Sequence, residues 1–210
     1  MAVTPDLRLV LVDPNAEVCA AFTERFAGLP GVTVVQNRFE RLPEFDCMVS
    51  AANSFGLMDG GVDAAITRFF GNALQDRVQR RILDEFLGEQ PVGTSIIVET
   101  DHPRHPFIAH TPTMRTPMTI ARTDHVYVAM SAMLLAVRRH NGRAPRRITM
   151  VACPGLGTAT GHVPPREAAR QMAMAYDNFL RPPTALGWDL AMRRQTAIRY
   201  GGDLGLLIDP

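Results

Sequence analysis

The chain of 210 residues carries a net charge of +1, with 46% hydrophobic and 20% charged residues, which is typical of a globular domain with a sizeable core. This balance excludes a general electrostatic attraction to nucleic acid or to a membrane surface. Every basic residue other than histidine is Arg, so a lysyl Schiff base and a Walker-type phosphate loop are excluded as well.

Strand-like and helical hydrophobic patterns alternate along the chain. Strands are predicted at residues 8–12, 32–35, 47–50, 94–99, 107–110 and 147–152. Helices are predicted at residues 16–27, 62–70, 73–87, 124–139 and 166–180, and a loop at residues 111–119. The alternation predicts an α/β fold with a mixed, mostly parallel sheet and helices on both faces. Pro182-Pro183 interrupts the pattern, so we expect one domain at residues 1–181 and a C-terminal extension at residues 182–210 that packs on the domain or on a neighbouring subunit.

Several features suggest the compartment and argue against a metal. No apolar run reaches the roughly 18 residues of a membrane span, and the N-terminus has a strand-like pattern instead of a secretory leader. Cys19, Cys47 and Cys153 are widely spaced in apolar surroundings, so they are predicted to be small buried side chains and not zinc ligands. We therefore expect a cytoplasmic protein with no membrane association, no metal and no cofactor. A metal held by the histidines at 102, 105 and 110 is the alternative to surface or core roles for them.

The segment from residue 46 to residue 71 is the most informative part of the chain. It predicts a buried strand, then a loop that carries Asn53, Asp59, Gly60 and Gly61, then a helix that begins near Val62. Glycine lets a ligand approach the backbone closely, because no Cβ stands in the way. The free N–H groups and the dipole of a helix start favour an anion. This loop predicts a site for a sugar joined to phosphate.

A second loop, at residues 153–164, also follows a predicted strand. Gly155, Gly157 and Gly161 would allow its backbone N–H groups to wrap a diphosphate, and Thr158 and Thr160 could add hydroxyl donors. Ligands of open α/β sheets bind beyond the carboxyl ends of the strands. If both strands lie centrally in the sheet, the two loops face each other across one cleft.

The sequence SAANSFGLMDGGVDAAI resembles the signature of the macro domain family, in which an N-A-A-N run ends a strand and Gly-Gly-Val-Asp opens a helix. Asn53 matches the second Asn of that run, and Ser50 stands at the place of the first. Residues 154–164 resemble the second ligand loop of the family, Pro-x-(Ile/Leu)-x-Thr-Gly, with Ala159 at a position that is usually Gly. The similarity covers roughly residues 32–180.

The resemblance implies a three-layer α/β/α sandwich that binds ADP-ribose or an ADP-ribosylated macromolecule. Asn53 would bind the distal ribose hydroxyls, while two backbone segments would hold the diphosphate. These segments comprise Gly60, Gly61 and Val62 in the first loop, and Gly157, Thr158, Ala159, Thr160 and Gly161 in the second. The Asp that binds adenine in many members has its equivalent near Arg38-Phe39, where no Asp stands. Phe39 could offer a backbone N–H or a stacking face there, or could pack in the core.

Catalysis depends on carboxylates near the distal ribose. Hydrolysis there needs a positioned water and stabilisation of an oxocarbenium-like charge. Asp63 matches the Asp that is linked to activity in hydrolase-type members, although a first-turn Asp is also favoured by the helix dipole alone. Asp59 is the second candidate, or a solvated turn residue. Thr67 stands where hydrolases often carry His, and the branch with a catalytic Lys is excluded.

Three functions remain open at this stage. The first is an ADP-ribose-binding enzyme, either a mono-ADP-ribosyl hydrolase or a phosphatase of the Appr-1″-p processing type, which acts on ADP-ribose 1″-phosphate. The second is a module that reads ADP-ribosylated partners without turnover. The third is an NAD-dependent oxidoreductase built on Gly155-x-Gly157, which lacks the following strand with a terminal acid that such a motif requires.

Overall fold

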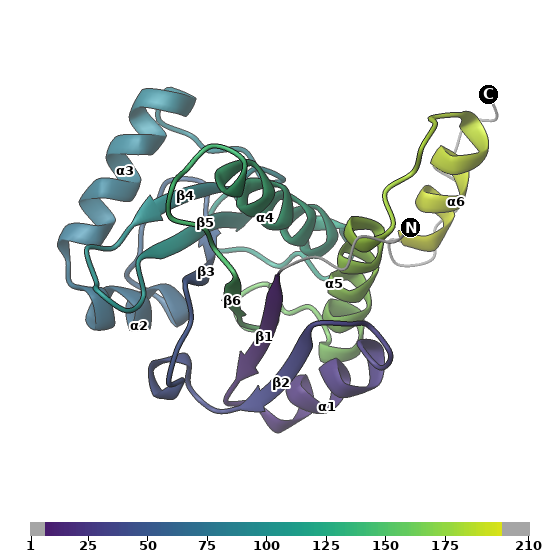
Figure 1. Ribbon diagram of the computed structural model, residues 1–210, viewed down its shortest axis with the longest axis horizontal. Coiled ribbons are helices and arrows are strands. Elements are labelled where there is room, and N and C mark those ends of the chain that lie inside the picture. Colours follow the sequence, from purple (N-terminus) through teal and green to yellow (C-terminus); the bar gives the residue numbers. More distant parts are fainter. Residues whose placement is uncertain (1–6, 199–210) are drawn as a thin grey trace.

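The computed structural model describes residues 7–198 (Figure 1). Six strands form one sheet in the order β2-β1-β6-β3-β5-β4. Their bounds are Arg8–Asp13 (β1), Val32–Gln36 (β2), Cys47–Asn53 (β3), Ile96–Glu99 (β4), Phe107–Met114 (β5) and Met150–Cys153 (β6). All neighbouring strands are parallel except β4 and β5, which are antiparallel. The predicted mixed, mostly parallel sheet is confirmed.

Helices cover both faces of this sheet and enclose two separate cores. The helices are Ala16–Arg25 (α1), Gly61–Phe70 (α2), Ala73–Phe86 (α3), His125–Asn141 (α4), Pro165–Leu180 (α5) and Trp188–Ile198 (α6), with a short 3-10 helix, η1, at Phe39–Arg41. Side chains of α1, α4 and α5 pack against one face, and side chains of η1, α2 and α3 pack against the other. Strand residues alternate between these cores because successive side chains of a strand point to opposite faces. The three-layer α/β/α sandwich is therefore confirmed (Figure 1).

Strand β5 is longer than its pattern predicts. Residues 111–114, predicted as part of a loop, continue the strand and pair with β3. This strand segment contains Pro112, and proline cannot donate to a sheet ladder. The antiparallel partner β4 ends its pairing at His110, so Pro112 lies where one side of β5 has no neighbour. The prediction of a loop at 111–114 was wrong, because a proline is compatible with a strand at a position where that strand has no neighbour on one side.

Strand β6 begins three residues later than predicted because side chains occupy the backbone groups before it. The carboxamide of Asn141 bonds both the N–H and the carbonyl of Ile148, at 2.7 and 2.8 Å. The carboxylate of Asp46 accepts the N–H groups of Thr149 and Met150 at 2.6 and 2.9 Å. Asp46 precedes β3, so this carboxylate joins the starts of two central strands.

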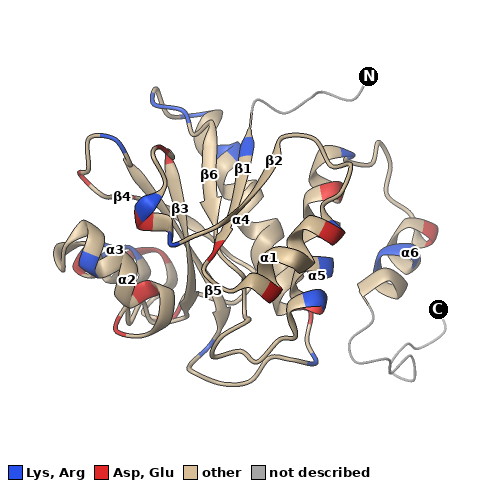
Figure 2. Ribbon diagram, turned by 90° about the horizontal axis from the view of Figure 1, so that it is seen from below, with Lys and Arg blue, Asp and Glu red and all other residues tan. Residues whose placement is uncertain are grey.

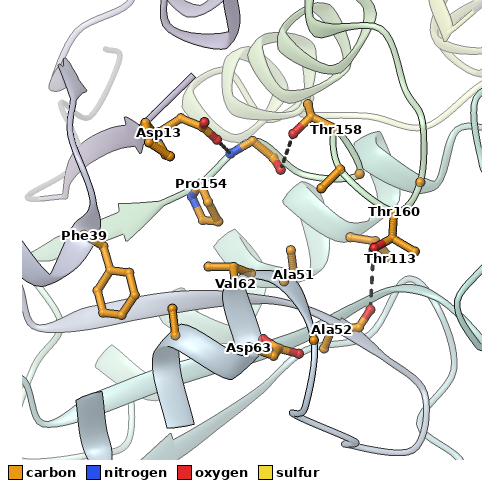
Figure 3. A pocket seen from close by; sticks show the side chains of 18 of the residues that line it. Asp13, Phe39, Ala51, Ala52, Val62, Asp63, Thr113, Pro154, Thr158 and Thr160 are labelled. Carbon is orange, nitrogen blue, oxygen red and sulfur yellow. Dashed lines mark hydrogen bonds between the residues drawn. The ribbon is translucent and has the colours of Figure 1, made fainter. Parts of the chain in front are cut away.

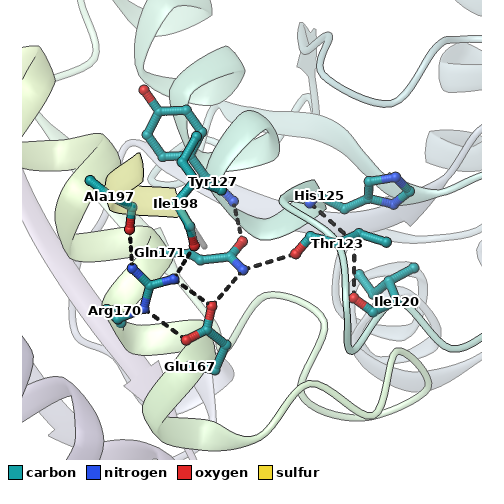
Figure 4. Close-up of polar contacts among 9 residues, drawn as sticks. All are labelled: Ile120, Thr123, His125, Tyr127, Glu167, Arg170, Gln171, Ala197 and Ile198. Atoms are coloured by element: carbon teal, nitrogen blue, oxygen red, sulfur yellow. Dashed lines mark hydrogen bonds and ion pairs between the residues drawn. The ribbon is translucent and has the colours of Figure 1, made fainter. Parts of the chain in front are cut away.

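Helix α6 lies beside α5 and away from the sheet (Figure 1). Figure 4 shows the polar group that joins the two helices. Arg170 of α5 pairs with Glu167 at 2.7 Å and donates to the carbonyls of Ala197 and Ile198 at the end of α6. Glu167 in turn accepts from the buried side chain of Gln171 at 2.9 Å. Residues 199–210 of the expected extension lie outside the described part of the chain.

Charged residues lie mainly on the helices and connections, while most strand residues are uncharged (Figure 2). None of the helices within residues 7–198 is long and apolar enough to cross a membrane.

Candidate functional site

A cavity of about 540 Å³ opens at the carboxyl ends of β1, β3, β5 and β6 (Figure 3). Its wall contains all the residues that the sequence predicted for ligand binding or catalysis: Phe39, Asn53, Asp59, Gly60, Gly61, Val62, Asp63, Gly155, Gly157, Thr158, Ala159, Thr160 and Gly161. The two glycine-bearing loops thus border one cleft, as the sequence predicted. The role of each residue toward a ligand stays a prediction.

Asn53 ends β3 and uses its carboxamide within its own loop. Its Nδ2 donates to the carbonyl of Leu57 at 2.7 Å. Its Oδ1 accepts from the backbone N–H groups of Phe55 at 3.0 Å and Leu57 at 3.3 Å. These three hydrogen bonds brace the first loop.

The start of α2 faces the cavity without a side-chain cap. Gly60 is the N-cap residue, with φ −130° and ψ 159°, and no side chain bonds the first N–H groups of the helix. A Cβ at Gly60 or Gly61 would meet no atom within 4 Å, so the space beside the backbone is open. Gly61 has φ 55°, which favours glycine. Uncapped N–H groups and the positive end of the helix dipole make this end of α2 suited to an anion.

Asp63 lies in the first turn of α2, at the inner wall of the cavity. Only 5% of its surface is exposed, and Ser50 of β3 donates a hydrogen bond of 2.7 Å to its Oδ1. Burial raises the pKa of Asp63 to about 7, against the opposite effect of the Ser50 hydrogen bond, and the charge of Asp59 adds to the rise. The carboxyl group can therefore exchange a proton near neutral pH. Asp59 itself is exposed at the rim.

A second buried polar group lies next to Ser50 across the sheet. His110 of β5 is in register with Ser50 and is fully buried. Its Nδ1 lies 2.7 Å from Oε1 of Gln90, and its Nε2 has no hydrogen-bond partner among residues 7–198. Burial lowers the pKa of His110 to about 3, so the ring is neutral at neutral pH. Ser50 with Asp63 and His110 with Gln90 are thus two buried polar pairs on neighbouring strands.

The second loop is held in place by its own backbone and by a neighbouring segment. The N–H of Val163 bonds the carbonyl of Gly157 at 3.0 Å, and the N–H of Ile120 bonds the carbonyl of Gly161 at 2.8 Å. Gly157 has φ 71°, the left-handed conformation that suits glycine. Ala159 is not among the described residues with positive φ, so an alanine fits where the family usually has glycine. The loop is therefore preformed around the cavity.

Asp13 is a functional candidate that the sequence analysis missed. It ends β1 and lines the cavity, and its Oδ2 accepts the N–H of Gly155 at 3.1 Å (Figure 3). Its Oδ1 accepts the N–H of Asn15, whose side chain caps α1. In the sequence it lies between the predicted strand at 8–12 and the predicted helix at 16–27, with no motif that marks it as a ligand residue. Applying the rule on carboxyl ends of parallel strands to β1 as well would have identified it.

Arg115 and the histidines at 102 and 105 have partners outside the cavity. Arg115 pairs with Glu89 at 2.6 Å and is not part of the cavity wall. The rings of His102 and His105 stack on each other at 4.8 Å, and His105 stacks on Phe45 at 3.9 Å. Within residues 7–198 no group of three or more His, Cys, Asp and Glu side chains is arranged to hold a metal ion.

Substitution of Gly161 by Ala is expected to destabilise the second loop. An added Cβ would lie 2.6 Å from the Gly157 carbonyl oxygen and 2.8 Å from Cγ1 of Ile120, so the loop must shift. We expect a loss of about 1–3 kcal/mol in the free energy of unfolding, measured by urea denaturation. Ala159→Gly, at an exposed position of the same loop, serves as the control with a change below about 1 kcal/mol. Equal effects of the two changes would contradict the tight packing at Gly161.

Two loops at the carboxyl ends of a mostly parallel sheet, with an uncapped helix start between them, define an α/β/α protein with a cleft suited to an anion. The family model of the Macro domain matches residues 49–172, which is more than half of the chain, and the chain belongs to this family. A protein of Aquifex aeolicus is 32% identical over 134 residues, which are 64% of this chain and 74% of that protein.

Solved macrodomains share the fold. The macrodomain of Mycobacterium tuberculosis DarG superposes with a TM-score of 0.58 at 18% identity, over 70% of this chain and 90% of that chain. A mutant macrodomain of Oceanobacillus iheyensis, solved with ADPR, superposes with a TM-score of 0.59 at 21% identity, over 78% of this chain and 89% of that chain.

Proposed function

We propose that the cleft binds ADP-ribose or an ADP-ribosyl group. The observation that supports this most directly is the joint position of two glycine-bearing loops and the uncapped start of α2 on one cavity. Family membership and the solved relative with ADPR support the same ligand. The diphosphate would lie at the N–H groups of Gly60, Gly61 and Val62 and along residues 157–161. Asn53 would hold the terminal ribose.

In the catalytic version of this proposal, Asp63 is the general base. Its carboxylate would take a proton from a water whose oxygen bonds to the anomeric carbon of the terminal ribose, while the bond from that carbon to the leaving group breaks. A pKa of about 7 lets Asp63 act as a base at and above neutral pH. Asp59, at the exposed rim, could add negative charge beside an oxocarbenium-like centre. The reaction would then be hydrolysis of a mono-ADP-ribosyl linkage or, by related chemistry, of ADP-ribose 1″-phosphate.

A binding module without turnover is the second candidate function, and one observation favours it. The Oδ1 atom of Asp63 already accepts from Ser50, and the carboxyl group is almost fully buried. In that arrangement Asp63 would tie α2 to β3 and leave the cavity without a base. The protein would then recognise ADP-ribosylated partners and release them unchanged.

Two measurements test these proposals together. Calorimetric titration with ADP-ribose and with NAD should show clear preference for ADP-ribose, and Asn53→Ala should weaken binding. Incubation with a mono-ADP-ribosylated protein should release ADP-ribose at a rate that increases with pH through about 7, and Asp63→Asn should abolish release.

The results separate the alternatives. Tight binding of ADP-ribose without release supports the binding module. Preference for NAD would favour the oxidoreductase and contradict the proposed ligand. Release that persists in Asp63→Asn would remove this residue from the mechanism. Thermal unfolding of each variant shows whether a loss of binding reflects a loss of folding.

A further inference from the structure

Two arginines lie at one end of the cavity with no ion pair. Arg38 and Arg68 both line the cavity and are exposed, and neither guanidinium has an ion-pair or hydrogen-bond partner among the described residues. They are the only cationic side chains of the cavity wall as far as residues 7–198 define it. Their charge is therefore available to a ligand.

The packing of two phenylalanines brings these arginines to the same end. Arg38 precedes Phe39 of η1, and Arg68 precedes Phe69 of α2. The two rings are in edge contact, with centroids 5.5 Å apart. The last turn of a helix favours a basic residue through the dipole, which explains the charge of Arg68 but not its position on the cavity wall.

This end of the cavity is distant from the proposed diphosphate site. Val62, Ala65 and Arg68 line the cavity along one face of α2. At a rise of 1.5 Å per residue, Arg68 lies about 9 Å along the helix from Val62. Figure 3 shows Phe39 at the opposite end of the cavity from Thr113 and Thr160. In the proposed binding mode, the nucleoside of ADP-ribose lies beyond the diphosphate, on the side away from Asn53. The two arginines would therefore flank the nucleoside.

Two arginines elsewhere on the same layer are neutralised by carboxylates, whereas the exposed Arg80 beside them has no ion pair among the described residues. In the groove between α3 and β4, Arg77 pairs with Asp101 and Arg81 pairs with Glu85. Arg81 also donates to the carbonyl of Ile97 at 3.1 Å. Arg38 and Arg68 have no comparable partners, although the carboxylate of Glu40 lines the same cavity. The carboxylates of Asp13, Asp59 and Asp63 also line the cavity, but neither they nor Glu40 form an ion pair with Arg38 or Arg68 among the described residues, so both guanidinium groups stay open to a ligand.

We infer that the nucleoside end of the cleft recognises a third phosphate, and that the preferred ligand is an ADP-ribosyl group phosphorylated on its adenosine ribose. This inference rests on the proposed function. A phosphate monoester presents three oxygens, and the planar fork of arginine binds phosphate oxygens in pairs. Glu40 remains available to accept from the amino group of the base or from a ribose hydroxyl.

Calorimetric titration with ADP-ribose and 2′-phospho-ADP-ribose tests the inference. We expect the wild-type protein to bind the phosphorylated ligand at least about ten-fold more tightly, since charge-assisted hydrogen bonds contribute on that scale. The double variant Arg38→Gln and Arg68→Gln should lose this preference and bind the two ligands with equal affinity. Arg41→Gln is the matched control. Arg41 ends the 3-10 helix that Arg38 precedes, and it is exposed but does not line the cavity.

Each outcome has one meaning. Equal wild-type affinities for the two ligands would overturn the third-phosphate site while leaving ADP-ribose binding intact. A preference that persists in the double variant would also overturn it, because the arginines would not be its cause. Binding of neither ligand by folded wild-type protein would contradict the proposed function itself. Loss of the preference in Arg41→Gln would show a nonspecific charge effect and would overturn the assignment to Arg38 and Arg68.

Discussion

Gly60→Asp is expected to lower the affinity for ADP-ribose roughly 100-fold while leaving the protein at least as stable as the wild type. The extended conformation of Gly60 suits any residue, and an added Cβ meets no atom within 4 Å. Aspartate is a preferred N-cap and complements the helix dipole, which together contribute about 0.5–1 kcal/mol to stability. The same carboxylate would repel a diphosphate at the start of α2 by about 2–4 kcal/mol at the effective dielectric constant near a protein surface.

The matched control is Gly60→Asn, which has the same shape and also caps a helix but carries no charge. Titration calorimetry should show a much smaller loss of affinity for this variant, and thermal unfolding should show both variants folded. Similar affinities of the Asp and Asn variants would mean that no anion binds at the first turn of α2. Comparison of the two variants thus separates the effect of the added negative charge from the effect of the added side-chain volume.

Asp63→Asn is expected to stabilise the protein by on the order of 4 kcal/mol at pH 8 and hardly at all near pH 4. The pKa of Asp63 is about 7 in the folded protein, against 3.8 for an ordinary Asp. The folded state therefore binds the proton more tightly than the unfolded state, and wild-type stability falls as pH rises between these values. Above pH 7 the full cost of the buried charge is present, at about 1.36 kcal/mol per pKa unit. Asparagine keeps the shape and an oxygen that can accept from Ser50.

Urea denaturation of both proteins at several pH values measures this difference. His110 acts in the opposite direction, because its lowered pKa reduces stability as pH falls from 6.5 toward 3. Subtracting wild-type from variant stability at each pH removes the contribution of His110. Asp59→Asn, at an exposed position, is the control and should show no comparable dependence on pH. A variant that is no more stable than wild type at pH 8 would contradict the burial of an ionisable carboxyl at residue 63.

The sequence predicted the layers of the fold and both glycine-bearing loops because their signals are local. Glycines and short polar residues at the end of an apolar run indicate a loop after a strand, whatever else the chain does. The two loops were expected to border one cleft, because ligands of open α/β sheets bind beyond the carboxyl ends of the strands. For this reason Asn53 and Gly157, far apart in the chain, were expected on one cleft and were found there.

The features of the fold and the site that the sequence did not predict depend on contacts between distant segments. The length of β5 follows from where β4 stops, and Pro112 alone points the other way. Asp13 lies between a predicted strand and a predicted helix, and only the course of β6 beside β1 brings it to Gly155. The burial of Asp63 depends on Ser50 facing α2 across the layer. Each of these features has a sequence signal with a sufficient local explanation, so local reasoning had no cause to look further.

The position of β6 determines when the cleft can exist. β6 is the last strand within residues 7–198, yet it inserts between β1 and β3 and joins the two halves of the sheet. The bond from Gly155 to Asp13 spans 142 residues. During synthesis on the ribosome, β1 with β2 and β3 with β5 can pair early, but they remain separate until residues 150–161 have emerged. The cleft would therefore form only when nearly the whole domain is made, and a truncated product ending before β6 would lack the second of its two loops.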